Sequence, residues 1–239
     1  MNKHTIIIGG GGGIGRALVP RLRTLNHHVT VISRDDANHQ GLDATTLTAD
    51  ARDIDALDAA VGECNRQLPI TGMVCLAGSI LLKPAHMTSS EEWAATIGTN
   101  LTTAFACVRA AGKHMTDGGS IVLTSTVAAA TGLPNHDAIA AAKAGVEGLV
   151  RSAAATYAGR GIRCNAVAPG LVDTPLAERI TRSERALEHS RKMHPLGRIG
   201  TPDDVASAID WLLSDGSDWV TGQSIGIDGG LGATRAGSS

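Results

Sequence analysis

The chain has 239 residues, of which 43% are hydrophobic, and its formal net charge at pH 7 is -2. This length and apolar content suit one domain over residues 1–239 with a large core. The near-zero charge gives no general attraction to nucleic acids or anionic membranes, and no apolar stretch approaches the ~18 residues that a membrane span needs. We therefore expect a small-molecule partner and no nucleic acid or membrane partner.

The four cysteines and nine histidines are not arranged as a disulfide framework or a metal site. No C-x-x-C pair occurs, and no two histidines at i and i+4 have a glutamate between them. The start of the sequence lacks a charged leader followed by a long apolar segment. We expect reduced thiols, a cytoplasmic location and no metal.

The first element is a β-branched run, residues 6–8, that leads into a glycine-rich turn, residues 9–15, and then into a helical stretch from Arg16. In a strand–turn–helix unit the N–H groups of the first helical turn point at one spot, where the helix dipole also favours negative charge. Glycine lets the backbone approach a phosphate closely, because it has no Cβ. A flexible linker would not be flanked by a strand and a helix. The turn therefore predicts a nucleotide site.

After this turn, short β-branched runs alternate with helical stretches, which is typical of βαβ units and a parallel sheet covered on both faces. The expected strands are residues 5–8, 29–33, 46–49, 72–76, 120–124, 162–167 and 224–227. This pattern predicts an α/β fold with a doubly wound, seven-stranded parallel sheet. Ligands of such sheets bind beyond the carboxyl ends of the strands, so the residues that follow each strand are the candidates for function.

The glycine spacing indicates the kind of nucleotide site. Gly9, Gly13 and Gly15 form a G-x-x-x-G-x-G pattern, with Ile14 before the last glycine. This pattern resembles that of the short-chain dehydrogenase/reductase family, although Ile8 stands where the family has threonine. The resemblance extends over nearly the whole chain. It implies a single-domain Rossmann fold that binds a nicotinamide dinucleotide through these glycines and Ile14.

The end of the second strand bears on the choice between NADP(H) and NAD(H). NAD-binding relatives have an acidic residue there, which accepts hydrogen bonds from the ribose 2′-OH. Here the position is Ser33, followed by Arg34, and a hydroxyl beside a guanidinium suits a 2′-phosphate. We expect NADP(H) in preference to NAD(H). The alternative is that Arg34 is a surface residue paired with Asp35 or Asp36.

Three further segments match parts of the family that contact the cofactor. Asp50 and Ala51 match a pair that meets the adenine ring, a plain loop aspartate being the alternative. Ala77 and Gly78 keep half of the family's Asn-Asn-Ala-Gly motif, whose small residues let the backbone approach the ribose. Asn100 matches the asparagine that interrupts the next helix and holds a water. Asparagine is otherwise disfavoured inside an apolar helix.

The catalytic residues that the resemblance implies are altered. The family has a serine after the fifth strand, a tyrosine thirteen residues later and a lysine four residues after the tyrosine. Lys143 sets the alignment and would bind the nicotinamide ribose, so the serine position is Thr126 and the tyrosine position is Ile139. The family's tyrosine protonates the carbonyl oxygen as hydride arrives at carbon, and isoleucine cannot. The one tyrosine of the chain, Tyr157, would lie roughly 20 Å along the same helix from Lys143, so we expect it to serve packing or an interface.

His136, seven residues before Lys143, is a candidate for the missing acid. It would lie about 20° from Lys143 around the helix axis if the helix already ran there. Enoyl-carrier-protein reductases, which resemble this family, have a tyrosine at that spacing, and histidine is a competent acid near neutral pH. The alternative is a helix-start residue that is capped by Asn135 or paired with Asp137.

The loop after the sixth strand resembles the family's nicotinamide-binding loop. Pro169, Gly170, the backbone of Val172 and the hydroxyl of Thr174 would contact the nicotinamide end of the cofactor. Residues 175–194 are helical in pattern and rich in charge. In relatives the segment at about 175–196 is a mobile lid over the substrate, and a solvated charged face is the alternative. Another helix is expected after it, with Thr201 as N-cap and Pro202 in its first position.

Three functions fit these features. The first is an NADPH-dependent reductase of an activated double bond or acidic enol, with the proton coming from water or His136. The second is a slower carbonyl reductase that uses Thr126, His136 or a water held by Lys143. The third is a non-catalytic dinucleotide-binding protein that acts as a sensor or partner subunit. We favour an NADP(H)-dependent oxidoreductase.

Apolar residues near the expected pocket indicate a small apolar substrate. They are Ile80, Leu81, Leu82, Leu133, Ile139 and Leu176. In relatives the helix that bears the lysine and the last strand make the subunit contacts, so a homotetramer or a dimer is expected.

Overall fold

The structure is a computed structural model that describes residues 3–234. Its centre is a seven-stranded parallel sheet with the order β3-β2-β1-β4-β5-β6-β7. The strands are β1 (His4–Ile8), β2 (His28–Ser33), β3 (Thr45–Thr48), β4 (Gly72–Cys75), β5 (Gly119–Thr124), β6 (Ile162–Pro169) and β7 (Ser224–Ile227). Each boundary lies within two residues of the one expected from the sequence. The predicted fold class is confirmed.

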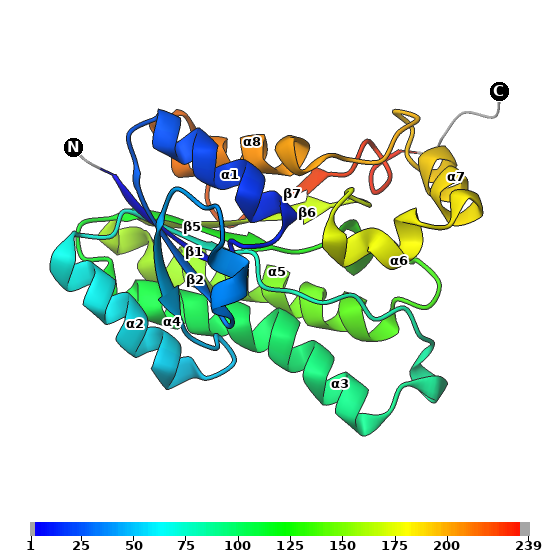
Figure 1. The fold of residues 1–239 in the computed structure, drawn as a ribbon, viewed down its shortest axis with the longest axis horizontal. Coiled ribbons are helices and arrows are strands. Elements are labelled where there is room, and N and C mark those ends of the chain that lie inside the picture. The colour runs from blue at the N-terminus through cyan, green and yellow to red at the C-terminus, as the bar shows by residue number, and fades with distance from the viewer. Residues whose placement is uncertain (1–2, 235–239) are drawn as a thin grey trace.

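Helices cover both faces of this sheet (Figure 1). They are α1 (Gly13–Thr24), α2 (Ile54–Gln67), α3 (Ser90–Ile97), α4 (Thr103–His114), α5 (Asp137–Tyr157), α6 (Glu178–Thr181), α7 (Glu184–Met193) and α8 (Pro202–Leu213). Because side chains alternate along a strand, Ile7 packs with α1 and α8, whereas Ile6 and Ile8 pack with α2, α4 and α5. Both faces of β1 are therefore buried.

The sheet order reverses at β1, which lies between β2 and β4. A crevice forms at such a switch point, because the connections on its two sides run in opposite directions. This places the turn after β1 between the loops that follow β2 and β4.

The segment expected to be helical over 175–194 is interrupted. A short 3₁₀ turn, Pro175–Ala177, leads into α6, and two residues separate the end of α6 from the start of α7. The break follows from Ser183, whose side chain accepts a hydrogen bond from the amide of Ala186 at 3.3 Å and so caps a new helix. In Figure 1 the two helices lie at one end of the molecule, beyond the ends of β6 and β7.

Within residues 3–234 no helix is both long and apolar enough to cross a bilayer. The same residues contain no group of three histidine, cysteine, aspartate or glutamate side chains placed to hold a metal ion.

Candidate cofactor and active site

The turn between β1 and α1 has no room for side chains at its two ends. Gly9 has a φ of +77°, and a Cβ there would lie 2.8 Å from the amide nitrogen of Ala77. A Cβ at Gly15 would collide with the carbonyl group of Gly10. No side chain caps α1, whose N-cap residue is Gly12. The backbone therefore comes close to the β4 loop and leaves the N–H groups of α1 available to an anion.

Ile14, in the first turn of α1, is half-buried and packs against the core between the sheet and α1 and α8. Its side chain anchors the start of the helix.

A cavity of about 250 Å³ lies at the carboxyl ends of β1 to β4. Seven residues that the sequence assigned to cofactor binding line it: Gly9, Ser33, Arg34, Asp50, Ala51, Ala77 and Gly78. They come from four loops that are far apart in the sequence. The fold thus brings together the residues expected around the adenosine half of a dinucleotide.

Ser33 has a buried polar atom without a partner at this cavity. The residue is 6% exposed, and its Oγ makes no hydrogen bond to any residue that the structure describes. An unsatisfied buried hydroxyl costs about 1–3 kcal/mol. A ligand with polar groups at this point would satisfy it, so the site fits a ribose or a phosphate.

Arg34 is exposed and makes no ion pair within residues 3–234. Asp36, one of the two acids considered as its partner, instead lies 3.8 Å from His39 and accepts a hydrogen bond from Thr48. The charge of Arg34 helps to lower the pKa of Asp50. Its guanidinium therefore acts on the cavity and not on its sequence neighbours.

Arg52 is a cavity residue that the sequence reasoning missed. Its Nη2 donates to Asp50 Oδ2 at 2.6 Å, and its Nε donates to the same carboxylate at 3.0 Å. These hydrogen bonds hold the pKa of Asp50 below its usual range. Hydrophobic periodicity does not reveal an ion pair between residues 50 and 52. The only signal for Arg52 in the sequence was a basic residue just after the Asp-Ala pair.

Three of the expected residues, Gly78, Asn100 and Lys143, are adjacent at the edge of the cavity. A Cβ at Gly78 would lie 3.2 Å from Asn100 Oδ1 and 3.7 Å from Lys143 Nζ. Lys143 is 6% exposed, and its Nζ donates to the carbonyl oxygen of Thr124 at 2.7 Å. Burial lowers the pKa of Lys143 to about 8. This amine therefore titrates close to neutral pH.

Asn100 lies in a π-helical turn, Gly98–Thr102, which interrupts the passage from α3 to α4. Its Nδ2 donates to the carbonyl oxygen of Thr96 and to Ser79 Oγ, both at 3.0 Å, and its Oδ1 accepts from the amide of Ser79 at 3.1 Å. The asparagine thereby ties the loop after β4 to this helix. Such local helix distortions often accompany function.

The serine and tyrosine positions contain no strong proton donor. Thr126 Oγ1 lies 3.5 Å from the carbonyl oxygen of Pro169 and caps the amide of Ala128 at 3.4 Å. Ile139 is 6% exposed. The neighbouring Ser125, which the sequence reasoning did not consider, donates its hydroxyl hydrogen to Glu147 Oε1 at 2.8 Å. Its hydroxyl hydrogen is therefore directed at Glu147 and not at the amine of Lys143.

His136 precedes α5 instead of lying in it. Helix α5 begins at Asp137, and His136 has φ -101° and ψ 15°. The azimuth argument required the helix to include residue 136, so it does not hold. His136 Nδ1 lies 2.8 Å from the carbonyl oxygen of Pro134, and no side chain caps the helix. The histidine is thus a helix-start residue, as in the alternative reading, although neither Asn135 nor Asp137 holds it.

The loop after β6 reaches the start of α1. A Cβ at Gly13 would lie 2.8 Å from Thr174 Cγ2. Val172 is 7% exposed and forms a β-bridge with Gly200. The residues expected at the nicotinamide end and those expected at the phosphates are therefore neighbours in space.

Tyr157 lies far from these groups, at the end of α5. A Cβ at Gly112 would lie 2.5 Å from its hydroxyl oxygen, so its ring packs on α4. The guanidinium carbon of Arg160 lies 5.7 Å from the ring centroid. Tyr157 serves packing in this structure.

The sequence and the fold are similar to those of known proteins. The family model described as enoyl-(acyl carrier protein) reductase matches residues 9–232. The chain is 36% identical over 243 residues to cis-4-hydroxycyclohexanecarboxylate dehydrogenase from Sinomonas cyclohexanicum, covering 95% of this chain and 96% of the relative. It belongs to the short-chain dehydrogenase/reductase family.

Solved structures of family members superpose over almost the whole chain. Ligand-free aldohexose dehydrogenase from Thermoplasma acidophilum has a TM-score of 0.92 at 30% identity, covering 100% of this chain and 97% of the other. ElxO with NADP bound has a TM-score of 0.90 at 27% identity, covering 98% and 100%. The protein is an oxidoreductase of the short-chain dehydrogenase/reductase type, a family that uses a nicotinamide cofactor.

Proposed function

We propose that this short-chain dehydrogenase/reductase uses NADP(H) to reduce a carbonyl or an activated double bond of a small apolar substrate, with a proton donor other than tyrosine. The observation that carries the proposal is the cavity at the ends of β1 to β4, where the buried, unpartnered hydroxyl of Ser33 adjoins the exposed Arg34. A hydroxyl and a guanidinium suit the 2′-phosphate that distinguishes NADP(H).

Each part of the cofactor has residues of this chain that would hold it. The pyrophosphate would bind at the α1 turn, the 2′-phosphate at β2, the adenine at the β3 loop, the riboses at the β4 loop and α5, and the carboxamide at the β6 loop. The residues are Gly9, Gly13, Ile14, Gly15, Ser33, Arg34, Asp50, Ala51, Ala77, Gly78, Asn100, Lys143, Pro169, Gly170, Val172 and Thr174. When bound, the reduced nicotinamide supplies a hydride.

The proton has to come from a group other than residue 139. Lys143, with a pKa of about 8, is partly deprotonated near neutral pH and can exchange a proton with a nearby water. Thr126 would orient the substrate oxygen through its hydroxyl. His136, just before α5, stays a second candidate, through the ring nitrogen that does not contact the carbonyl oxygen of Pro134.

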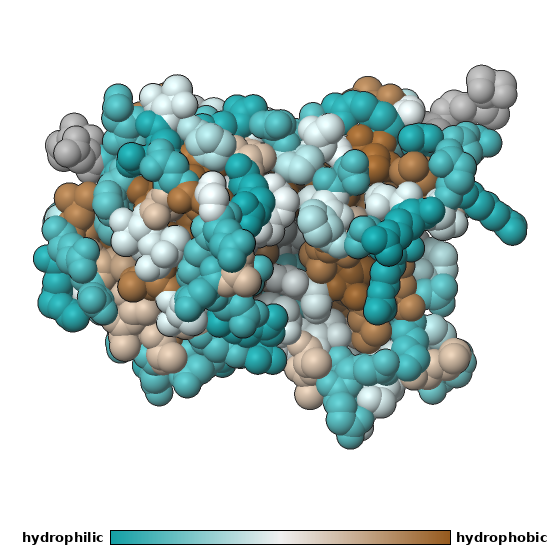
Figure 2. Space-filling view, viewed as in Figure 1, coloured by the Kyte–Doolittle hydropathy of each residue, from teal (hydrophilic) through white to brown (hydrophobic). Residues whose placement is uncertain are grey.

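The surface beside the site is apolar. Ile80, Leu82 and Leu176 are 41%, 43% and 54% exposed. Figure 2 shows apolar surface gathered below α6, between that helix and α3. This surface supports an apolar substrate, with residues 175–196 acting as the lid.

The proposal includes a cytoplasmic homotetramer or dimer. A groove between α4 and α5 is lined by Phe105, which is 47% exposed, and by Leu149 and Tyr157. Trp219, just before β7, is 97% exposed. Large exposed apolar side chains of this kind are typical of subunit contacts. Light scattering of the purified protein would give its mass in solution.

Mixing the purified protein with NADPH or NADH and a panel of ketones, quinones and enones tests the function. We expect the protein to oxidise NADPH faster than NADH. The rate is measured as the loss of absorbance of the reduced coenzyme. A Ser33→Asp variant is the matched control, because a carboxylate there should repel the 2′-phosphate and favour NADH. Binding of NADPH without turnover of any substrate would favour the sensor or partner-subunit function. Ile139 also supports that function, because its aliphatic side chain cannot donate a proton. No binding heat with either coenzyme would overturn the proposal.

A further inference from the structure

A buried histidine joins the expected lid to the loop after β6. His194, at the end of α7, is 2% exposed. Its Nδ1 lies 2.6 Å from the carbonyl oxygen of Ser190, and its Nε2 accepts a hydrogen bond from the amide of Leu171 at 3.2 Å. A Cβ at Gly170 would lie 2.5 Å from the same Nε2. The ring therefore rests directly on the Gly170–Leu171 backbone.

The two partners of the ring allow only one protonation state. A carbonyl oxygen can only accept, so Nδ1 carries a hydrogen for Ser190. A backbone amide can only donate, so Nε2 has no hydrogen when it bonds to Leu171. A second ring proton would place two N–H groups against each other. The hydrogen bond from Leu171 would then be lost, in a place that water does not reach.

The backbone that this ring contacts carries the residues expected at the nicotinamide. Gly170 and Leu171 directly precede Val172, and Thr174 packs against Gly13 in the α1 turn. A displacement of the Leu171 backbone would therefore be transmitted through residues 172–174 to the edge of the cofactor site.

We propose that His194 is a positioning residue. As the neutral imidazole it holds the loop over 169–174 against the end of α7, and its protonation loosens this loop and weakens binding of the nicotinamide half of the cofactor. This inference rests on the proposed function and adds that pH regulates the binding of the cofactor.

No carboxylate of the described residues bonds to the ring to favour its charged form. On α7, Lys192 lies 3.5 Å from Glu188, and Arg191 lies 3.6 Å from Glu184 and 3.8 Å from Glu188. In the segment before α8, Arg198 pairs with Asp204 at 2.7 Å. Beyond β7, Asp228 accepts hydrogen bonds from the amides of Gly230 and Gly232, both at 2.9 Å. Each of these charged groups is paired or hydrogen-bonded away from the ring.

Calorimetric titration with two ligands at about pH 7.5 and at about pH 5.5 tests the inference. NADP⁺ spans the whole site, whereas 2′-phospho-ADP-ribose has the same 2′-phosphate and pyrophosphate but no nicotinamide. Because the 2′-phosphate itself titrates near pH 6, the fragment reports that effect alone. Acidification should weaken NADP⁺ binding about tenfold more than fragment binding, the effect of one buried hydrogen bond.

Two variants assign the difference to this histidine. His194→Gln keeps an acceptor near Leu171 without a titrating ring, so its extra loss for NADP⁺ should disappear even if its affinity at neutral pH is lower. His189→Gln, on the same helix and exposed, should behave as the wild type. Circular dichroism at both pH values verifies that each protein is folded.

The inference is overturned if the wild type loses no more affinity for NADP⁺ than for the fragment, a comparison that needs no variant. It is also overturned if His194→Gln keeps the extra loss. If neither ligand binds at either pH, the proposed function itself fails and the inference falls with it.

Discussion

At the scale of single residues, the candidate site has an aliphatic side chain at residue 139 and a buried amine at residue 143. Ile139 stands where the sequence pattern predicts the tyrosine of the family, and Lys143 lies next to Asn100 and Gly78. The lysine keeps its hydrogen bond to Thr124 at 2.7 Å even though its usual phenol partner is absent. The residues that we propose to bind the cofactor therefore lie together, whereas the predicted tyrosine position has no acidic group.

We predict that Ile139→Tyr creates or raises carbonyl reductase activity. A positioned acid typically contributes about 10²- to 10⁴-fold to the rate, and the lysine with a pKa of about 8 is available to assist a phenol. The measurement is NADPH oxidation with a panel of ketones. Ile139→Phe is the matched control, since it adds the ring without the hydroxyl. No gain in a folded, NADPH-binding variant would mean that the pocket differs from the family at more than one residue.

Lys143 also affects the free energy of unfolding. Burial lowers its pKa from 10.5 to about 8, so the cost of holding its charge is fully present below pH 8 and is relieved as pH rises from 8 to 10.5. Lys143→Met is expected to stabilise the cofactor-free protein at pH 7 by up to about 3 kcal/mol and by much less near pH 10. Urea unfolding at both pH values measures this. Lys192→Met, 74% exposed in the wild type, should change little. Destabilisation at pH 7 would show that the hydrogen bond to Thr124 outweighs the burial cost.

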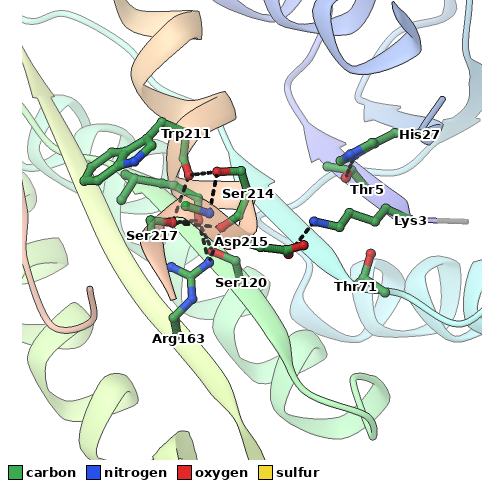
Figure 3. Close-up of polar contacts among 12 residues, drawn as sticks. Lys3, Thr5, His27, Thr71, Ser120, Arg163, Trp211, Ser214, Asp215 and Ser217 are labelled. Carbon is green, nitrogen blue, oxygen red and sulfur yellow. Dashed lines mark hydrogen bonds and ion pairs between the residues drawn. The ribbon is translucent and has the colours of Figure 1, made fainter. Parts of the chain in front are cut away.

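At the scale of elements, both ends of α8 are bonded to other parts of the chain. Its first turn has the expected N-cap, in which Thr201 and Asp204 form a reciprocal capping box with Pro202 at the first position. Hydrogen bonds from Arg198 hold the pKa of Asp204 well below its usual range. At its other end, Arg163 of β6 donates to the carbonyl oxygens of Leu212 at 2.8 Å and Ser214 at 3.3 Å (Figure 3).

Arg163→Met is expected to lower the free energy of unfolding by about 2 kcal/mol, because half-buried carbonyl groups would lose their donor. Ser120 and Ser217 still donate to Leu212 at 2.7 and 3.1 Å, which limits the loss (Figure 3). Denaturant unfolding measures the effect. The exposed Arg66, changed to Met, should alter the same quantity by no more than about 0.5 kcal/mol. Equal effects of the two changes would show that the hydrogen bonds from Arg163 do not specifically stabilise this end of α8.

At the scale of the whole molecule, the two edges of the sheet have different tasks. The carboxyl ends of the strands form the candidate site, whereas the amino ends of β1 and β2 contain buried histidines that bond to threonines. His4 Nε2 lies 2.9 Å from Thr30 Oγ1, and His27 Nδ1 lies 3.1 Å from Thr5 Oγ1. His27 appears beside Thr5 in Figure 3. Cofactor binding and acid stability can therefore be changed separately.

We predict that these histidines make the fold sensitive to acid. Burial lowers the pKa of His4 and of His27 from 6.5, so their neutral forms contribute stability that is complete above pH 6.5 and is lost as pH falls below it. Thermal unfolding should begin at a lower temperature at pH 5 than at pH 7.5. The double variant His4→Gln/His27→Gln should show a weaker dependence on pH. An unchanged dependence would place the acid sensitivity in the carboxylates instead.

The elements were predictable because their signals are local. Short apolar runs mark the strands, and the turn after β1 is marked by the run of glycines over residues 9–15. The break between α6 and α7 was missed, because the charged pattern continues through Ser183 and only the cap at Ala186 reveals it. His136 was placed on α5 for a similar reason, since one residue decides where a helix starts.

From its sequence alone, this protein could be assigned its fold class, its family and the absence of a tyrosine at residue 139, because these depend on residue type and short spacings. Tertiary structure decided which polar groups meet: Arg52 on Asp50, Ser125 on Glu147, and His194 on Leu171, while Ser33 was left without a partner. The partners in the last two pairs are 22 and 23 residues apart. Such contacts depend on how helices and loops pack around the sheet, and no local pattern in the chain encodes that packing.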